Sequence, residues 1–176
     1  MRHAVRIVAG ASIIFLALSV VRPVAARTQA ATTPAPAETL VIAGDVTQPL
    51  SITPADLKAM PRTRVAVSEE GRQISYEGVL VGELLKRAGA PVGRDLSGKA
   101  VATYVRASAK DGYQVVFSLA ELDPAFTPND IIVADTIDGK PLFDYQGPFR
   151  IVAPHDKRGA RSIRMLQRLE VVRLVK

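Results

Sequence analysis

The chain contains no cysteine. It therefore has no disulfide, and it offers no thiolate for nucleophilic catalysis, for redox chemistry or for ligation of a soft metal. Histidine is almost as rare, because only His155 lies beyond the N-terminal region. A zinc or copper site rich in histidine is therefore not expected, and the sequence suggests no metal ligands.

Aromatic residues are few and scattered. The 176 residues include no Trp, four Tyr and five Phe. Proteins that bind RNA or DNA usually combine aromatic side chains with a strongly basic face. The sequence lacks this combination, so we expect no nucleic acid partner.

The N-terminal region has the pattern of an export signal. Arg2 and Arg6 flank an apolar run over residues 7–21, which is followed by Pro23 and a small-residue cleavage site at residues 24–26. The run is shorter than the roughly 20 residues that a membrane span requires. We therefore expect residues 1–26 to be a Sec-type signal peptide and the protein to be periplasmic or secreted, without a membrane partner after cleavage. An uncleaved membrane anchor is the alternative.

Removal of the signal peptide would also lower the charge. Residues 1–26 contain three arginines and no acidic residue, so Lys and Arg fall from 23 to 20 against 17 Asp and Glu, which leaves a net charge of +3. Residues 27–38, rich in Ala, Thr and Pro, have the composition of a flexible linker. Residues 39–176 have the length of a single domain.

Within that domain, strands are expected to outnumber helices. Thr53 and Pro54 mark the start of a short helix, and a second helix is expected from Val81 to Ala88 because its apolar residues repeat at helical spacing. Asp111-Gly112 predicts a tight hairpin turn. Further strands are expected near residues 40–44, 63–67, 72–76, 131–135, 149–153 and 168–175, with a helical turn at 161–166. This pattern favours the α+β class, with mixed or antiparallel sheets and a few short helices.

The most distinctive stretch is Gly147–Met165, GPFRIVAPHDKRGARSIRM, which we call the basic segment. Guanidinium and ammonium groups at this density suit a phosphate or carboxylate. A solvated basic loop is the alternative for most of these residues, and a solvated strand position is the alternative for Arg150. The candidate anion ligands on this segment are Arg150, His155, Lys157, Arg158, Arg161 and Arg164. Arg161 and Arg164 would share one face of the expected helical turn.

The sequence also resembles a known family. The segments GDVTQPLSITPADLKAMP, YEGVLVGELLKRAG, ASAKDGYQVVFSLAEL and DGKPLFDYQGPFRIVAPHDKRGARSIRMLQRLEV occur in the order found in the molybdopterin-binding domain of sulfite-oxidase-type oxidoreductases. The resemblance covers nearly all of residues 40–174. It implies the mixed α+β fold of that family, a molybdenum cofactor with a cysteine ligand, and oxygen-atom transfer.

The resemblance also gives the basic segment a role, because the corresponding segment of the family holds the phosphate of the pterin. The resemblance is strongest at the DGY motif and at GPFRIVAP, and the candidate cofactor-binding residues also include Ser162, Asp111 and Tyr113. For Asp111, a turn role alone is sufficient, and for Tyr113 simple packing is the alternative to a hydroxyl placed near the pocket. For His155, a structural or surface role is the alternative to cofactor binding.

This chain departs from the family at the metal ligand. The cysteine is expected near Arg64–Ser68, where the sequence offers only Ser68. A serine hydroxyl is hard and protonated near neutral pH, so it cannot replace a soft thiolate. We therefore expect an exported module that binds a small anionic or pterin-type ligand, or an exported protein partner, without redox chemistry. The alternative is a molybdopterin-dependent oxidoreductase whose metal site uses an oxygen donor.

Overall fold

A computed structural model describes residues 38–128 and 130–174, and all of them lie in one unit, Ala35–Lys176. The expected signal peptide and residues 27–37 of the expected linker lie outside the described residues. The described strands are β1 (Leu40–Gly44), β2 (Leu50–Ile52), β3 (Thr63–Glu69), β4 (Arg72–Leu80), β5 (Thr103–Ala109), β6 (Gln114–Ser118), β7 (Ile132–Ile137), β8 (Lys140–Pro141), β9 (Arg150–Val152) and β10 (Leu166–Arg173).

Helices are short in the described residues. The two α-helices are α1 (Pro54–Lys58) and α2 (Val81–Arg87). Single 3-10 turns occur at η1 (Gly93–Asp95), η2 (Gly98–Val101), η3 (Ala120–Leu122), η4 (Asp144–Gln146) and η5 (Gly159–Arg161). None of the helices in this part of the chain is long and apolar enough to span a membrane.

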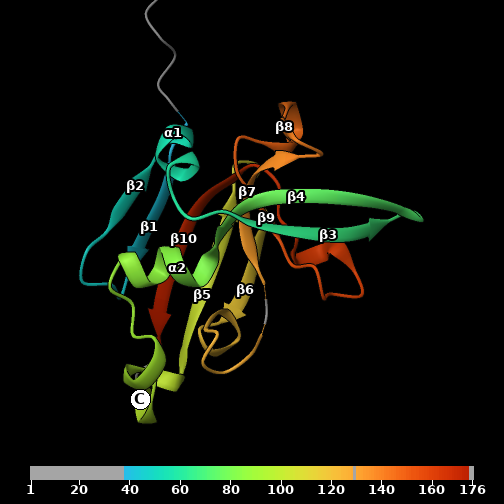
Figure 1. The fold of residues 1–176 in the computed structure, drawn as a ribbon. Helices are drawn as coiled ribbons and strands as arrows, with labels where there is room; N and C mark the ends of the chain where they lie inside the picture. Colours follow the sequence, from blue (N-terminus) through green and yellow to red (C-terminus); the bar gives the residue numbers. More distant parts are fainter. Residues whose placement is uncertain (1–37, 129, 175–176) are drawn as a thin grey trace, which may run out of the picture. The chain divides into compact units, whose positions relative to one another are not determined.

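The strands form two sheets (Figure 1). The first has the order β2-β1-β10-β5-β6, and its β1–β10 pair is parallel while its other pairs are antiparallel. The second has the order β3-β4-β7-β8, with β9 also paired to β7, and it is antiparallel throughout. The predicted α+β class with mixed and antiparallel sheets is therefore confirmed.

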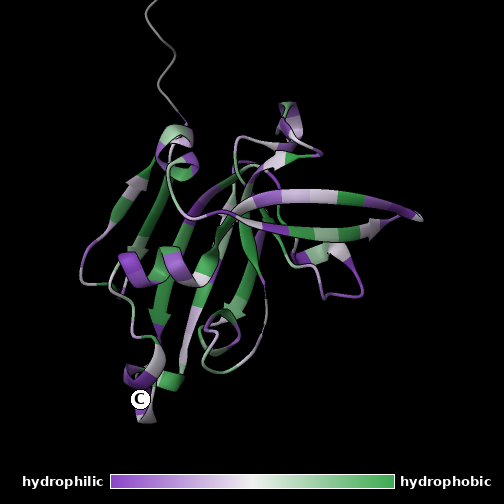
Figure 2. Ribbon diagram, viewed as in Figure 1, coloured by the Kyte–Doolittle hydropathy of each residue, from purple (hydrophilic) through white to green (hydrophobic). Residues whose placement is uncertain are grey.

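Alternating burial along the strands builds the core. In β5 the side chains alternate between buried and partly buried, as expected of a strand whose one face packs inward. The apolar strands appear green in Figure 2. Leu84 and Leu85 of α2 are fully buried in the main core. A smaller apolar cluster contains Val65, Tyr76 and Val152, and it attaches the β3–β4 hairpin to β7 and β9.

The β3–β4 hairpin extends beyond its neighbour strand (Figure 1). Strand β4 pairs with β7 only from Tyr76 to Leu80, so its first residues pair with β3 alone. The turn uses Glu70 and Gly71, both with positive φ. This arrangement places the last residues of β3 beside the basic segment.

Local sequence signals were confirmed where they concern caps and turns. The Thr53 side chain accepts a hydrogen bond from the Asp56 backbone, and the Asp56 carboxylate accepts one from the Thr53 backbone, so α1 starts with a capping box. Gly112 has a positive φ in the turn between β5 and β6. Gly89 has a positive φ directly after α2 and its C-cap, Ala88.

One predicted element lies elsewhere. The helical turn expected at residues 161–166 is the 3-10 turn η5 at Gly159–Arg161, and β10 begins at Leu166. Arg161 ends η5, and Arg164 lies beyond it in irregular chain. The expectation that these two arginines share one helix face is therefore wrong, because no helix connects them.

Candidate functional site

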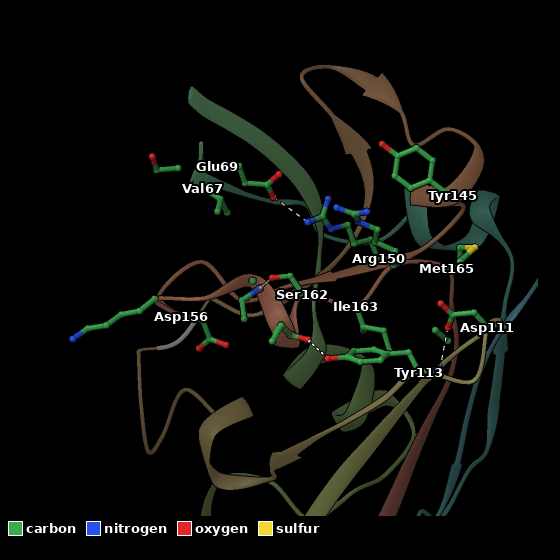
Figure 3. A pocket seen from close by; sticks show the side chains of 17 residues that line it. Val67, Glu69, Asp111, Tyr113, Tyr145, Arg150, Asp156, Ser162, Ile163 and Met165 are labelled. Carbon is green, nitrogen blue, oxygen red and sulfur yellow. Dashed lines mark hydrogen bonds and ion pairs between the residues drawn. The ribbon is translucent and has the colours of Figure 1, made fainter. Parts of the chain in front are cut away.

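A cavity of about 550 Å³ lies between the end of β3, the β5–β6 turn and the basic segment. Its volume lies within the range of small-molecule sites. The lining residues come from these three regions and from η4 (Figure 3). They are Val67, Ser68, Glu69, Ala109, Asp111, Tyr113, Tyr145, Arg150, Ala153, Asp156, Lys157, Gly159, Ala160, Ser162, Ile163, Arg164 and Met165.

Arg150 is the shared donor of a buried hydrogen-bond network next to this cavity. Its side chain comes from β9, and the residue is only 3% exposed. The Arg150 guanidinium donates to the Tyr76 hydroxyl at 2.5 Å, to Gln146 Oε1 at 2.7 Å and to Glu69 Oε1 at 3.0 Å. Its CZ atom lies 4.7 Å from the centre of the Tyr76 ring. Glu69 therefore compensates the charge of Arg150 within the protein.

Burial and this network act on the Tyr76 hydroxyl in opposite directions. Burial raises the pKa of Tyr76 to about 12, against the opposing charges of Arg150 and, more weakly, Arg164. The hydroxyl therefore stays protonated at neutral pH and donates to Glu69 at 3.2 Å. Arg164 thus contributes positive charge near the same hydroxyl.

Arg161 has a different position from the one predicted. It donates to both oxygens of Asp156 at 2.8 Å and to the Glu121 carboxylate at 3.1 Å and 3.2 Å. It also stacks on Phe117, with 4.8 Å between CZ and the ring centre. Hydrogen bonds from Arg161 to Asp156 raise the pKa of Arg161 further above its usual range. Arg161 therefore ties the loop after β9 to η3 and is not part of the cavity lining.

Arg164 and Lys157 remain available to a ligand. Both line the cavity, and both are exposed. The CZ atom of Arg164 lies 5.2 Å from the ring centre of Tyr145, which is itself 53% exposed. Neither cation forms an ion pair within residues 38–128 and 130–174.

The structure brings together six of the nine residues that the sequence suggested. Asp111, Tyr113, Arg150, Lys157, Ser162 and Arg164 line the cavity. His155, Arg158 and Arg161 do not belong to the lining, although they lie on the same segment. The Ser162 hydroxyl accepts a hydrogen bond from the Ala153 backbone at 3.1 Å, and the Tyr113 hydroxyl donates to the Ala160 carbonyl at 2.9 Å. Both hydrogen bonds hold the basic segment in place.

Sequence reasoning missed three polar lining residues. Glu69 lies between the strands expected at 63–67 and 72–76, Asp156 lies among basic residues that drew attention instead, and Tyr145 has no local signal. The partner of Glu69 is 81 positions away in the chain, at Arg150. No pattern within a short window indicates such a contact.

The donor set of the cavity does not fit a molybdenum held by a protein thiolate. The end of β3 offers Val67, Ser68 and Glu69 to the cavity, and the chain has no cysteine. The Glu69 carboxylate is already engaged by Arg150 and Tyr76. Within the described residues, moreover, no group of three or more His, Cys, Asp or Glu side chains is placed to hold a metal ion. The cavity volume and its cations do fit an organic anion.

Comparisons with known proteins agree with this fold. The solved structure of the sulfane dehydrogenase SoxCD from Paracoccus pantotrophus matches with a TM-score of 0.60 and 21% identity, over 76% of this chain and 37% of that chain. The present chain thus spans well under half of that protein. No curated protein matches the chain. A family model described as the oxidoreductase molybdopterin binding domain matches residues 29–175. The chain therefore belongs to the family of oxidoreductase molybdopterin-binding domains.

Proposed function

We propose that this domain binds a small organic anion, such as a phosphate ester, in the cavity beside the basic segment, and that it carries out no redox chemistry there. The observation that carries the proposal is the pair Arg164 and Lys157. Both line the cavity, and neither has an ion-pair partner in the described part of the chain.

Unpaired positive charge supports an anionic ligand. Arg164 acts on the Tyr76 hydroxyl together with Arg150, and unlike Arg150 it has no ion-pair partner in the described part of the chain. An anion placed against Arg164 would balance its charge through charge-assisted hydrogen bonds, which are stronger than neutral ones. Arg150 also has one buried donor, Nε, without a hydrogen-bond partner. The site therefore contains a buried donor that no acceptor in the described residues satisfies.

The non-redox part of the proposal rests on the donor chemistry. Redox catalysis at molybdenum with a thiolate ligand needs a sulfur donor that this chain lacks. A non-thiolate oxidoreductase remains the competing function, because the family is established for this chain. In keeping with the N-terminal pattern, we place the binding reaction in the periplasm or outside the cell.

Calorimetry with inorganic phosphate and simple phosphate monoesters tests the binding function. Arg164→Gln is expected to weaken binding about tenfold, because a charge-assisted hydrogen bond is worth roughly 1.5 kcal/mol or more. Arg158→Gln is the matched control, since Arg158 lies on the same segment but not in the lining. Its binding constant is expected to change by less than about twofold, through long-range charge alone.

Two results would overturn the proposal. If neither phosphate nor the monoesters bind the wild-type protein or raise its melting temperature, the binding function is wrong, since a ligand of the folded state must stabilise it. If protein purified from its native compartment carries stoichiometric molybdenum, the non-redox part is wrong and the competing oxidoreductase function gains support.

A further inference from the structure

Three carboxylates line the cavity, but only one lacks a cationic partner in the described part of the chain. Glu69 accepts from Arg150 and Tyr76. Both oxygens of Asp156 accept from Arg161. Asp111 accepts only the backbone N–H of Tyr113, through Oδ1 at 2.9 Å. The neighbouring ammonium of Lys110 is paired with Glu38 instead.

The unpaired carboxylate and the unpaired cations come from different segments of the chain. Asp111 lies on the turn between β5 and β6, whereas Lys157 and Arg164 lie on the basic segment. Figure 3 shows Asp111 beside Tyr113, away from the group formed by Arg150 and Glu69. The cavity thus offers a ligand both unpaired cations and an unpaired carboxylate, within the described part of the chain.

We propose that the ligand is amphoteric, with an anionic group bound by Arg164 and Lys157 and an ammonium or amino donor bound by the Asp111 carboxylate. This inference rests on the proposed anion-binding function and names its ligand class. A ligand that carries only negative charge would face repulsion from Asp111, whereas a cationic donor at that end turns the repulsion into attraction. The exposed ring of Tyr113, two residues from Asp111, also lines the cavity and offers the ligand an apolar contact.

Matched pairs of phosphate esters test the proposal. The probes are ω-aminoalkyl phosphates of increasing chain length, each compared with the alkyl phosphate in which a methyl group replaces the ammonium. At the best chain length, the wild-type protein is expected to bind the aminoalkyl phosphate about two- to fivefold more tightly than the alkyl phosphate. A partly exposed ion pair contributes an affinity difference of this size.

The Asp111→Asn variant removes the negative charge of residue 111 but keeps the hydrogen bond of the turn. Asparagine keeps a side-chain oxygen for the Tyr113 N–H, so the turn is retained. The variant is expected to lose the preference for the aminoalkyl phosphate and to bind the alkyl phosphate more tightly than the wild type. Asp138→Asn is the control, because Asp138 occupies another Asp-Gly turn and accepts the Ser75 N–H outside the cavity. It is expected to keep the wild-type preference.

The outcomes distinguish this inference from the function beneath it. If both members of each pair bind the wild type equally, or if Asp111→Asn keeps the preference, the amphoteric ligand is wrong while anion binding stands. If neither member binds the wild type at all, the anion site itself is wrong, and the inference is overturned with it.

Discussion

Arg161 tests whether a residue of the basic segment binds a ligand or stabilises the fold. The sequence suggested that it binds a ligand, whereas in the structure it forms ion pairs with other parts of the chain. The Arg161→Ala substitution removes the ion pairs with Asp156 and Glu121 and the stacking on Phe117. It does not remove a residue of the cavity lining. We therefore expect mainly a loss of stability, with a smaller loss of anion affinity because Asp156, which lines the cavity, loses its partner.

The size of the effect follows from these contacts. The Arg161 side chain is 35% exposed, and the two carboxylates are 24% and 21% exposed, so solvent screens the pairs only in part. Two such pairs contribute ~0.5–1 kcal/mol each, and the contact with the Phe117 ring adds ~0.5–1 kcal/mol. The free energy of unfolding is expected to fall by ~2 kcal/mol. For a domain of this size, that lowers the melting temperature by about 8 °C.

Urea denaturation and thermal melting measure the stability, and calorimetry with a phosphate ester measures the binding at a temperature where the variant is folded. Arg158→Ala is the control, and its stability is expected to stay within ~0.5 kcal/mol of the wild type. The reasoning is refuted if Arg161→Ala unfolds like the wild type but has lost ligand affinity. That result would mean that Arg161 leaves Asp156 and contacts the ligand directly.

Two further predictions concern the fold around the site. In the folded protein the pKa of Tyr76 is raised from 10.0 to about 12, so its contribution to stability is present below pH 10 and is lost as the pH rises towards 12. Phenolate absorbance should show one late-titrating tyrosine, which is absent in the Tyr76→Phe variant. Simultaneous titration of all four tyrosines would contradict this prediction. The Gly78→Ala substitution should prevent folding or lower the free energy of unfolding, measured by urea denaturation, by more than ~3 kcal/mol, because a Cβ there would meet the Val133 carbonyl oxygen at 2.0 Å. In the control Gly71→Ala the new Cβ meets nothing within 4 Å, so the free energy of unfolding should fall by only ~1 kcal/mol, for the positive φ. Equal falls in the two variants would contradict the steric argument.

Features set by neighbouring residues were predictable from the sequence. The capping box of Thr53 and Asp56 and the turn at Asp111-Gly112 each depend on residues within a few positions of one another. The same holds for the reciprocal hydrogen bonds between Ser118 and Glu121. Short-range hydrogen bonding and glycine conformation determine these features, so a local pattern is sufficient to find them.

Features set by distant contacts were not predictable. The parallel pairing of β1 with β10 joins residues from opposite ends of the described unit. Strand β2 has only three residues, and β8 only two, so neither shows a clear alternation. Arg161 was assigned to a ligand because nothing near it in sequence shows that Glu121, 40 positions away, accepts from it. The identity of an ion-pair partner depends on the tertiary fold, which the local pattern does not contain.

The fold thus divides the charges of the basic segment between two tasks. Arg150 and Arg161 are each neutralised by carboxylates from distant elements, Glu69 and Glu121, and these contacts hold the cavity walls together. Arg164 and Lys157 have no such partner in the described part of the chain, so their charge remains for a ligand. A count of basic residues would treat all four as equivalent. Their ion pairs show instead that substitutions in one pair should act on stability, and substitutions in the other on affinity.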